Sequence, residues 1–549
     1  MSLSHTSTMA AARSSSEERY ILRPRPTRAL PDALRAAGNG LTVNGYIDVP
    51  SGISSGRSTP VPHDAPPSVQ SLSTARKAAR AQAKHRLFHT INYVPRVSHF
   101  DPQSEYRDFR GFFVLFWISL TIMVITTGLR NLKETGHPLR VEVYELLSRN
   151  VISLGLSDAA MVASSALSLP IQKLTRGTNG ILRWRRAGIW IQSIYQALWL
   201  TLWVSWPFLL NWTWTAQVFF ALHTLTFLMK MHSYAFYNGH LAETERRLQD
   251  LDKPDTADRG KAVKYPGSPS RLRQLDPDSS PEEKEAEEEL SQLRQDLAKE
   301  LTSPLGQVTY PQNLTLYNYA DYVLCPTLCY ELEYPRTQKI RWDELFYKTL
   351  AVFGCIFLMI TISEEFIKPV LAESAARLKL VQSISDRALI LAETTSLMLF
   401  PFMITFLLVF LVIWEYILGA FAEITCFADR HFYSDWWNSS DWLEFSREWN
   451  MPVYHFLRRH VFFSSKTYFS TPVAMTITFL VSSLGHELIM GCITKKLRGY
   501  GFFAMMLQLP IVALQRSKLV RGRWVLNNAA FWSSMILGLS MMCSLYVLV

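Results

Sequence analysis

The sequence predicts an all-α membrane protein, a polytopic bundle of about nine transmembrane helices. Hydrophobic residues make up 48% of the 549 residues, and the chain is rich in aromatic residues, with 31 Phe, 22 Tyr and 16 Trp. The apolar residues also gather in long runs with few or no charges. Because about 20 apolar residues in a helix cross the core of a bilayer, runs of this length indicate transmembrane helices.

Nine apolar segments account for this number. Four carry no charge over a spanning length: Gly111 to Leu129, Ala187 to Leu210, Ser396 to Trp414 and Trp524 to Val549. Three are shorter and need tilt or neighbouring helices to span: Trp214 to Met229, Thr349 to Ser363 and Gly499 to Leu514. The last two contain ionisable residues: Val151 to Pro170 with Asp158, and Pro472 to Thr494 with His486 and Glu487.

Two regions lack this apolar pattern. Residues 1–100 are rich in Ser, Pro, Ala and Arg, and we expect a disordered basic tail in the cytosol. Residues 241–305 contain a run of Glu and are expected to form an acidic cytosolic insertion within the membrane domain, residues 101–549. The net charge of +10 follows from membrane topology, so no nucleic-acid partner is predicted. Six Cys without metal-type spacing predict neither a metal site nor a disulfide framework.

His486 is the most informative ionisable residue. Glu487 is the only other ionisable side chain in its apolar stretch, 472–494. Such residues are costly at membrane depth, so a functional role is the default interpretation. A neutral imidazole suits a general base that takes a proton from a lipid alcohol. Two alternatives stay open: a ring that only hydrogen-bonds between helices, and a proton relay that includes Asp158 and Glu393.

The segment FYSDWWNSSDWLEFSREWN, residues 432–450, is too polar to span a membrane and holds four of the 16 Trp. An interfacial aromatic belt explains the Trp residues. It does not explain the carboxylates, amides and arginine between them, which indicate a polar pocket with aromatic walls at the membrane surface. A CoA thioester needs stacking surfaces and cations of this kind. The cations that can supply the charge are Arg447, Arg458, Arg459 and Lys466.

Five segments follow one another along the chain: MKMHSYAFYNG at 229–239, PTLCYELEYPRT at 326–337, FYSDWWN at 432–438, SREWNMPV at 446–453 and SSLGHEL at 482–488. In this order they resemble the membrane-bound O-acyltransferase family, specifically its sterol and diacylglycerol branch. FYSDWWN matches the FYxDWWN motif of the family. MKMHSY resembles the sterol enzymes of this branch, and CFADRHFYSDWWNSS and the SREWN step are similar to the fungal sterol acyltransferases.

The resemblance implies the fold of this family and its reaction. A long-chain fatty acyl group would move from acyl-CoA to the 3β-hydroxyl of a membrane sterol, forming sterol esters for storage. Acyl-CoA is then a co-substrate, and no cofactor is expected. The expected location is the endoplasmic reticulum membrane, as a multi-pass homo-oligomer.

The resemblance also implies roles for single residues. His486 corresponds to the catalytic base and Asn450 to the second catalytic residue. Arg447, Trp449 and Ser482 match positions that contact acyl-CoA. Tyr454 is placed with them, although the family commonly has His there.

Seven further residues are expected to shape the acyl-CoA end of a tunnel or the substrate channel. The six motif residues are interpreted as more structural than catalytic, and the His of MKMHSY as a packing or channel residue. They are Phe432, Tyr433, Asp435, Trp436, Trp437, Asn438 and His232.

Three other functions stay open at this point. The nearest is esterification of diacylglycerol by the same machinery. A proton-coupled lipid transporter would use His486 as a relay without consuming acyl-CoA. A non-catalytic sterol sensor would bind sterol without releasing CoA. The FYSDWWN and SREWN segments argue against the last two.

Overall fold

The computed structural model describes residues 91–101, 104, 110–139, 141–177, 180–251, 293–304, 306–518, 520 and 522–549. Within these ranges the chain is helical, and strand-like pairing is limited to isolated bridges. In chain order, the helices up to residue 251 are α3 (Arg110–Thr135), α4 (Val141–Ser148), α5 (Val151–Ser165), α6 (Ser168–Gly177), η1 (Trp184–Gly188), α7 (Ile189–Leu209) and α8 (Trp214–Leu251).

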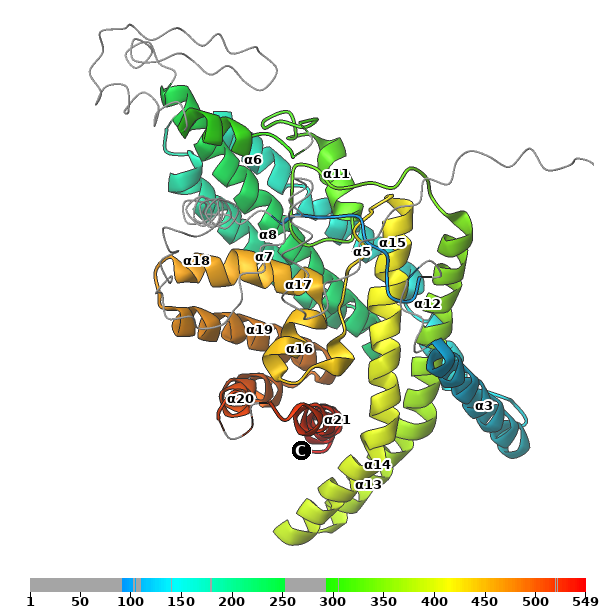
Figure 1. The fold of residues 1–549 in the computed structure, drawn as a ribbon. Coiled ribbons are helices and arrows are strands. Elements are labelled where there is room, and N and C mark those ends of the chain that lie inside the picture. The colour runs from blue at the N-terminus through cyan, green and yellow to red at the C-terminus, as the bar shows by residue number, and fades with distance from the viewer. Residues whose placement is uncertain are drawn as a thin grey trace, which may run out of the picture. The chain divides into compact units, whose positions relative to one another are not determined.

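The helices that follow include the two longest continuous helical stretches of the fold, Trp342–Leu380 and Ile384–Ile424 (Figure 1). They are α11 (Leu316–Leu324), α12 (Trp342–Ile362), η2 (Ser363–Ile367), α13 (Lys368–Leu380), α14 (Ile384–Phe410), η3 (Leu411–Ile417), α15 (Leu418–Ile424), η4 (Trp436–Asn438), α16 (Trp442–Glu448), α17 (Met451–Phe456), η5 (Leu457–Phe462), α18 (Phe463–Lys466), α19 (Thr471–Thr494), α20 (Tyr500–Gln515) and α21 (Trp524–Leu548).

Six helices of the described chain are long and apolar enough to cross a membrane: Gly111–Thr135, Val151–Gly177, Trp342–Leu380, Ile384–Ile424, Thr471–Thr494 and Trp524–Leu548. The expectation of nine transmembrane helices is therefore not confirmed. The other three expected segments correspond to α7, the first part of α8, and α20, which is apolar but shorter. In α7 the residues Gln192 and Gln196, together with several Trp, interrupt the aliphatic character.

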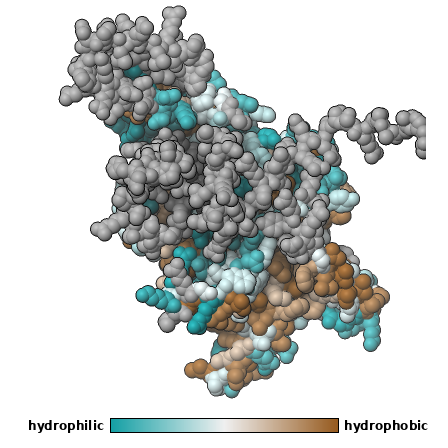
Figure 2. Space-filling model, viewed as in Figure 1, coloured by the Kyte–Doolittle hydropathy of each residue, from teal (hydrophilic) through white to brown (hydrophobic). Residues whose placement is uncertain are grey.

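The outer faces of these helices are apolar, as expected for contact with lipid. On α3 the side chains of Phe112, Ile122 and Leu129 are exposed. Hydrophobic residues gather over α3 and over the lower part of the view, where α13 and α14 end (Figure 2). A soluble protein rarely exposes an apolar surface of this extent, so the six helices are suited to a bilayer.

Each of the two longest helical stretches contains a π-helical turn. The turn η2 lies within Trp342–Leu380, and η3 lies within Ile384–Ile424. Such turns hold one residue more than an α-helical turn and are frequent at functional sites. Each of the two turns contains buried glutamate, at Glu364, Glu365 and Glu415.

The regions outside the expected helices are only partly described. Of the expected tail, residues 1–90 lie outside the described residues, while residues 91–100 make defined contacts with the body of the protein. In the expected acidic insertion, α8 continues to Leu251, and the run of Glu from 282 to 289 lies outside the described residues.

The Gly of the MKMHSYAFYNG segment has a steric role. A Cβ atom added at Gly239 would lie 1.9 Å from a ring atom of Trp184, which is buried in η1. We expect Gly239→Ala to destabilise the protein by at least about 1–3 kcal/mol, because the indole has to move. A thermal shift assay in detergent measures this loss. The matched control is Gly354→Ala in α12, where the added Cβ meets nothing within 4 Å; equal melting temperatures for the two variants would contradict the packing argument.

Candidate active site

His486 lies on α19, a helix that begins with Pro472 in its first turn and ends at Lys495 in a left-handed conformation. The His486 side chain is exposed, and its Nδ1 lies 2.8 Å from the carbonyl oxygen of Ser482, one turn earlier. Because a carbonyl only accepts, this contact assigns the proton of a neutral ring to Nδ1. The lone pair of Nε2 is then available to take a proton from a substrate hydroxyl, as a general base requires.

Glu487 points to other partners, as its position one residue along the helix requires. Its carboxylate accepts hydrogen bonds from the backbone N–H groups of Arg498, Gly499 and Phe502, at 3.2, 2.7 and 3.1 Å. The hydroxyl of Tyr546 also donates to it, at 2.5 Å. The carboxylate thus occupies the N-terminus of α20, where unpaired N–H groups favour an anion. It joins α19, α20 and α21 next to His486.

Asn450 is the N-cap of α17. Its Oδ1 accepts a hydrogen bond from the N–H of Val453 at 3.2 Å. Because Oδ1 accepts the capping hydrogen bond, the Nδ2 amino group is the part of the Asn450 side chain that can donate a hydrogen bond to an oxyanion. The helix continues directly into η5, which packs against α19, the helix of His486.

This geometry allows the capping role of Asn450 to be tested separately from its expected catalytic role. Asn450→Asp keeps the capping oxygen and replaces the Nδ2 amino group, the hydrogen-bond donor, by an oxygen. We therefore expect kcat to fall by about 10²–10³-fold with little change in melting temperature. Asn450→Ala should lose activity and also about 1 kcal/mol of stability. Acyl transfer and thermal unfolding are measured for both variants. Asp441→Asn, the reverse exchange at the N-cap of α16, keeps the capping oxygen, removes a surface ion pair with Arg516 and should stay active. An active Asn450→Asp protein would exclude the Nδ2 amino group from the chemistry.

Arg447 and Trp449 lie at the end of α16, a short helix capped by Asp441. The Trp449 ring packs among other aromatic residues, with ring centroids 4.5 Å from Phe406, 4.5 Å from Trp414 and 4.7 Å from Trp436. The expected acyl-CoA residue Trp449 is therefore half-buried and packs against the aromatic core.

The FYSDWWN segment is held mainly by buried aromatic residues. Phe432, Tyr433 and Trp436 are almost fully buried. The carbonyl of Trp437 accepts hydrogen bonds from α21, from Asn528 Nδ2 at 3.1 Å and from Trp532 Nε1 at 3.2 Å. These contacts give the segment a packing role, and its place at the acyl-CoA end of a tunnel stays a prediction.

The two polar members of the motif differ from each other. Asp435 precedes η4 and lies 3.0 Å from His99 Nε2. Asn438 is the last residue of η4 and is exposed. The structure thus brings Asp435, but not Asn438, into contact with the N-terminal segment.

One of the four expected CoA cations is not available to a ligand. Arg459 is 1% exposed, lies 2.9 Å from Glu331 Oε1 and donates to the carbonyl of Tyr330 at 3.0 Å. Burial raises the pKa of the Glu331 carboxyl, and the guanidinium of Arg459 opposes that rise. The expectation that Arg459 binds CoA is wrong, because a buried cation needs this carboxylate as its partner.

Of the other three expected cations, two are exposed and Arg447 is half-buried. Arg458 and Lys466 are exposed, and the Arg458 guanidinium lies 6.0 Å from the centre of the Tyr454 ring. Tyr454, at the position where the family commonly has His, is followed by His455. Burial and the neighbouring cations lower the pKa of His455 to about 4, so its ring is neutral near pH 7.

His232, the remaining predicted residue, packs inside the bundle. Its ring stacks on Phe236 with centroids 4.1 Å apart, and its Nδ1 lies 3.2 Å from Gln196 Oε1. The His460 ring contacts it edge-on. His232 therefore makes packing contacts, and its expected role beside a substrate channel stays a prediction.

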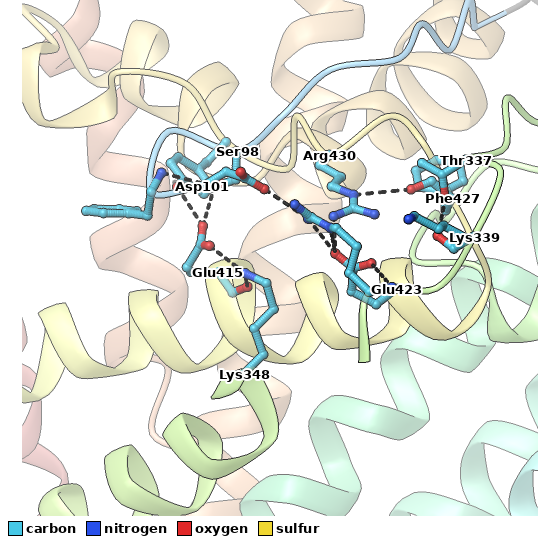
Figure 3. Close-up of polar contacts among 12 residues, drawn as sticks. Ser98, Asp101, Thr337, Lys339, Lys348, Glu415, Glu423, Phe427 and Arg430 are labelled. Atoms are coloured by element: carbon cyan, nitrogen blue, oxygen red, sulfur yellow. Dashed lines mark hydrogen bonds and ion pairs between the residues drawn. The ribbon is translucent and has the colours of Figure 1, made fainter. Parts of the chain in front are cut away.

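Sequence reasoning missed a network of buried charges beside the motif (Figure 3). Glu415 accepts hydrogen bonds from Lys348 Nζ at 2.8 Å, from Tyr433 at 3.0 Å and from Ser98. The carboxylate of Glu423, one helical segment further, pairs with Arg341 at 2.6 Å and with Arg430. Charged residues within apolar runs were a signal for Lys348 and Glu415, but the sequence did not identify their partners.

A cavity of about 550 Å³ lies elsewhere in the fold, lined by residues of α4, η2, α13 and the ends of α8 and α21, among them Glu145, Trp214, Glu364 and Lys368. None of the predicted site residues lines it.

Residues 182–548 match the membrane-bound O-acyltransferase family, and the chain belongs to this family. Among its relatives, the probable sterol O-acyltransferase 2 of Schizosaccharomyces pombe is 38% identical over 85% of this chain and 93% of its own length. The sterol O-acyltransferase 2 of Candida albicans is 35% identical over 84% of this chain and 79% of its own length. The diacylglycerol O-acyltransferase 1 of Dictyostelium discoideum is 32% identical over a shorter region, 52% of this chain and 42% of its own length.

Proposed function

We propose that the protein is an acyl-CoA:sterol O-acyltransferase that moves a long-chain fatty acyl group onto the 3β-hydroxyl of a membrane sterol. The observation that supports it most is the orientation of His486, whose Nδ1 contact with Ser482 leaves Nε2 to act as the base. The two sterol O-acyltransferases cover most of this chain, whereas the diacylglycerol enzyme covers about half.

The reaction follows from the two catalytic residues. Nε2 of His486 takes the proton of the sterol hydroxyl as its oxygen attacks the thioester carbonyl. A hydrogen bond from the Nδ2 amino group of Asn450 stabilises the negative charge that develops on the carbonyl oxygen. When the C–S bond breaks, the CoA thiolate takes the proton from His486, and the sterol ester is released. No covalent intermediate with the enzyme forms.

The acyl-CoA side of the site is assigned to the surface beside α16 and α17. In this proposal Arg447, Ser482 and Tyr454 contact the thioester arm. Arg458 and Lys466 supply positive charge for the CoA phosphates. The motif residues from Phe432 to Asn438 hold this surface in place, and His232 shapes the bundle behind it. We place the protein in the endoplasmic reticulum membrane as a homo-oligomer.

Labelled oleoyl-CoA tests the proposal in cells that lack endogenous sterol esters. The protein is expressed, and the label is followed into sterol ester and triacylglycerol, with both acceptors present. We expect the label in sterol ester. Label mainly in triacylglycerol would instead establish a diacylglycerol acyltransferase. Absence of transfer by a folded protein would favour a transporter or a sensor.

A further inference from the structure

A segment that precedes the first membrane helix lies across the FYSDWWN region. We name this segment, residues 91–101, the N-terminal strap. Its backbone pairs with the chain just before the motif: the N–H of Arg96 donates to the carbonyl of Ala428, and the N–H of Arg430 donates to the carbonyl of Arg96, both at 3.0 Å. The two segments are far apart in the sequence, so this pairing is a tertiary contact.

The side chain of Arg96 strengthens the pairing. Its guanidinium binds the carboxylate of Asp429 with two hydrogen bonds, Nε to Oδ1 at 2.8 Å and Nη2 to Oδ2 at 2.6 Å. The N–H of Val94 donates to the same carboxylate at 3.1 Å. Asp429 is 4% exposed, and a bidentate pair of this kind has a fixed geometry.

Two further strap residues contact the motif itself. The hydroxyl of Ser98 lies 3.0 Å from the hydroxyl of Tyr433, and both donate to the buried carboxylate of Glu415 (Figure 3 labels Ser98 and Glu415). The ring of His99 stacks on Tyr433 with centroids 5.4 Å apart. Its Nε2 lies 3.0 Å from Asp435. The strap thus touches the motif from Tyr433 to Asp435.

Two backbone hydrogen bonds connect the motif to the residues on either side of Asn450. The N–H of Ser434 donates to the carbonyl of Glu448 at 2.8 Å, and the N–H of Met451 donates to the carbonyl of Phe432 at 3.0 Å. The first bond holds the residue before Trp449, and the second holds the residue after Asn450. Residues 426–435 are not helical. Because no helix fixes this segment, its placement depends on such contacts with other parts of the chain.

We propose that the N-terminal strap positions the transfer site, with Arg96 as a positioning residue that acts through the motif on Asn450. The proposal rests on the proposed function only in its kinetic test. A displacement of about 1 Å at an oxyanion donor can cost a large part of the rate. The strap therefore sets kcat, while sterol binding does not depend on it.

The kinetic test is a double-mutant cycle between Arg96 and Asn450. We expect Arg96→Ala to lower kcat about tenfold or more with the KM for sterol unchanged, and Arg96→Lys to recover part of the loss. Added to Asn450→Ala, the Arg96→Ala change should cost little more, because the donor is already absent. The control is Arg130→Ala, which also takes an arginine from a buried carboxylate: Arg130 contacts Glu365 through Nη2 at 3.0 Å, away from the motif. It should leave kcat as it is.

Hydrogen exchange provides a test that does not depend on activity. The amides of Ser434 and Met451 should exchange faster in Arg96→Ala than in Arg130→Ala, at equal melting temperature or after correction for global unfolding. Unchanged exchange at these amides, or rate losses from Arg96→Ala and Asn450→Ala that simply add, would overturn the positioning role. A failure of the proposed function can be told apart from these outcomes. In that case the unmodified protein would form no sterol ester, while Arg96→Ala would still speed up exchange at the Ser434 and Met451 amides.

Discussion

His486→Ala lowers the rate of sterol esterification by about 10²–10⁴-fold, the contribution of a well-placed general base. The fold should be unaffected, because the ring is exposed and its Nδ1 contact is with the carbonyl of Ser482 on its own helix. Labelled ester formation per molecule of folded protein measures the effect. The amount of monodisperse protein and the melting temperature should match those of the unmodified protein.

A second histidine in an apolar helix supplies the control for this experiment. His223 of α8 lies 2.6 Å from Asp158, so His223→Gln keeps a donor for that carboxylate. This variant should retain activity. If His486→Ala kept more than a few per cent of the rate, His486 would not be the base, and a role in helix packing would explain it better.

Lys348→Ala is expected to cause the largest loss of stability. Lys348 and Glu415 are 8% and 3% exposed and lie 2.8 Å apart. Removing one partner of a buried ion pair leaves the other charge without compensation, at a cost of about 3–5 kcal/mol. The yield of folded protein and its thermal transition in detergent measure this loss. We also expect the pairing of Ser98 and Tyr433 with Glu415 to weaken, which reduces activity in the remaining protein.

A double variant separates the charge from the packing. In Lys348→Met with Glu415→Gln the buried charges are absent, while Gln still accepts hydrogen bonds from Ser98 and Tyr433. Replacing both members of such a pair is often close to neutral, so we expect most of the stability to return. A double variant as unstable as Lys348→Ala would show that shape rather than charge matters here.

The helices and catalytic candidates were readable in the sequence because their signals are local. His486 is conspicuous as an ionisable residue in an apolar run, and Asn450 lies within a short recognisable segment. The cap formed by Asn450 also depends only on residues up to Val453. The apolar runs and His486 were thus found from the local sequence, whereas Asn450 was singled out only by the resemblance to a family and its N-cap was not predicted.

The buried contacts around the motif were not readable, since their partners lie far away along the chain. Ser98 and Glu415 are 317 residues apart, and Arg96 and Asp429 are 333 apart. A single charged residue in an apolar run indicates that a partner exists without naming it. Arg459 was misjudged for the same reason: Glu331, its partner, lies in another segment.

The π-helical turn η3 constrains the length of the chain as well as its residues. Glu415 lies within this turn, and Glu423, which binds Arg341 and Arg430, follows it in the same helical stretch. The extra residue of a π-helical turn is accommodated within the turn itself, so the helix beyond it keeps its direction. Deletion of one residue from Leu411–Ile417 would restore an ordinary α-helix and leave Glu423 facing Arg341 and Arg430. Only side chains within the turn, Glu415 among them, would change direction, so we expect such a deletion to disturb the contacts of Glu415 and to spare those of Glu423.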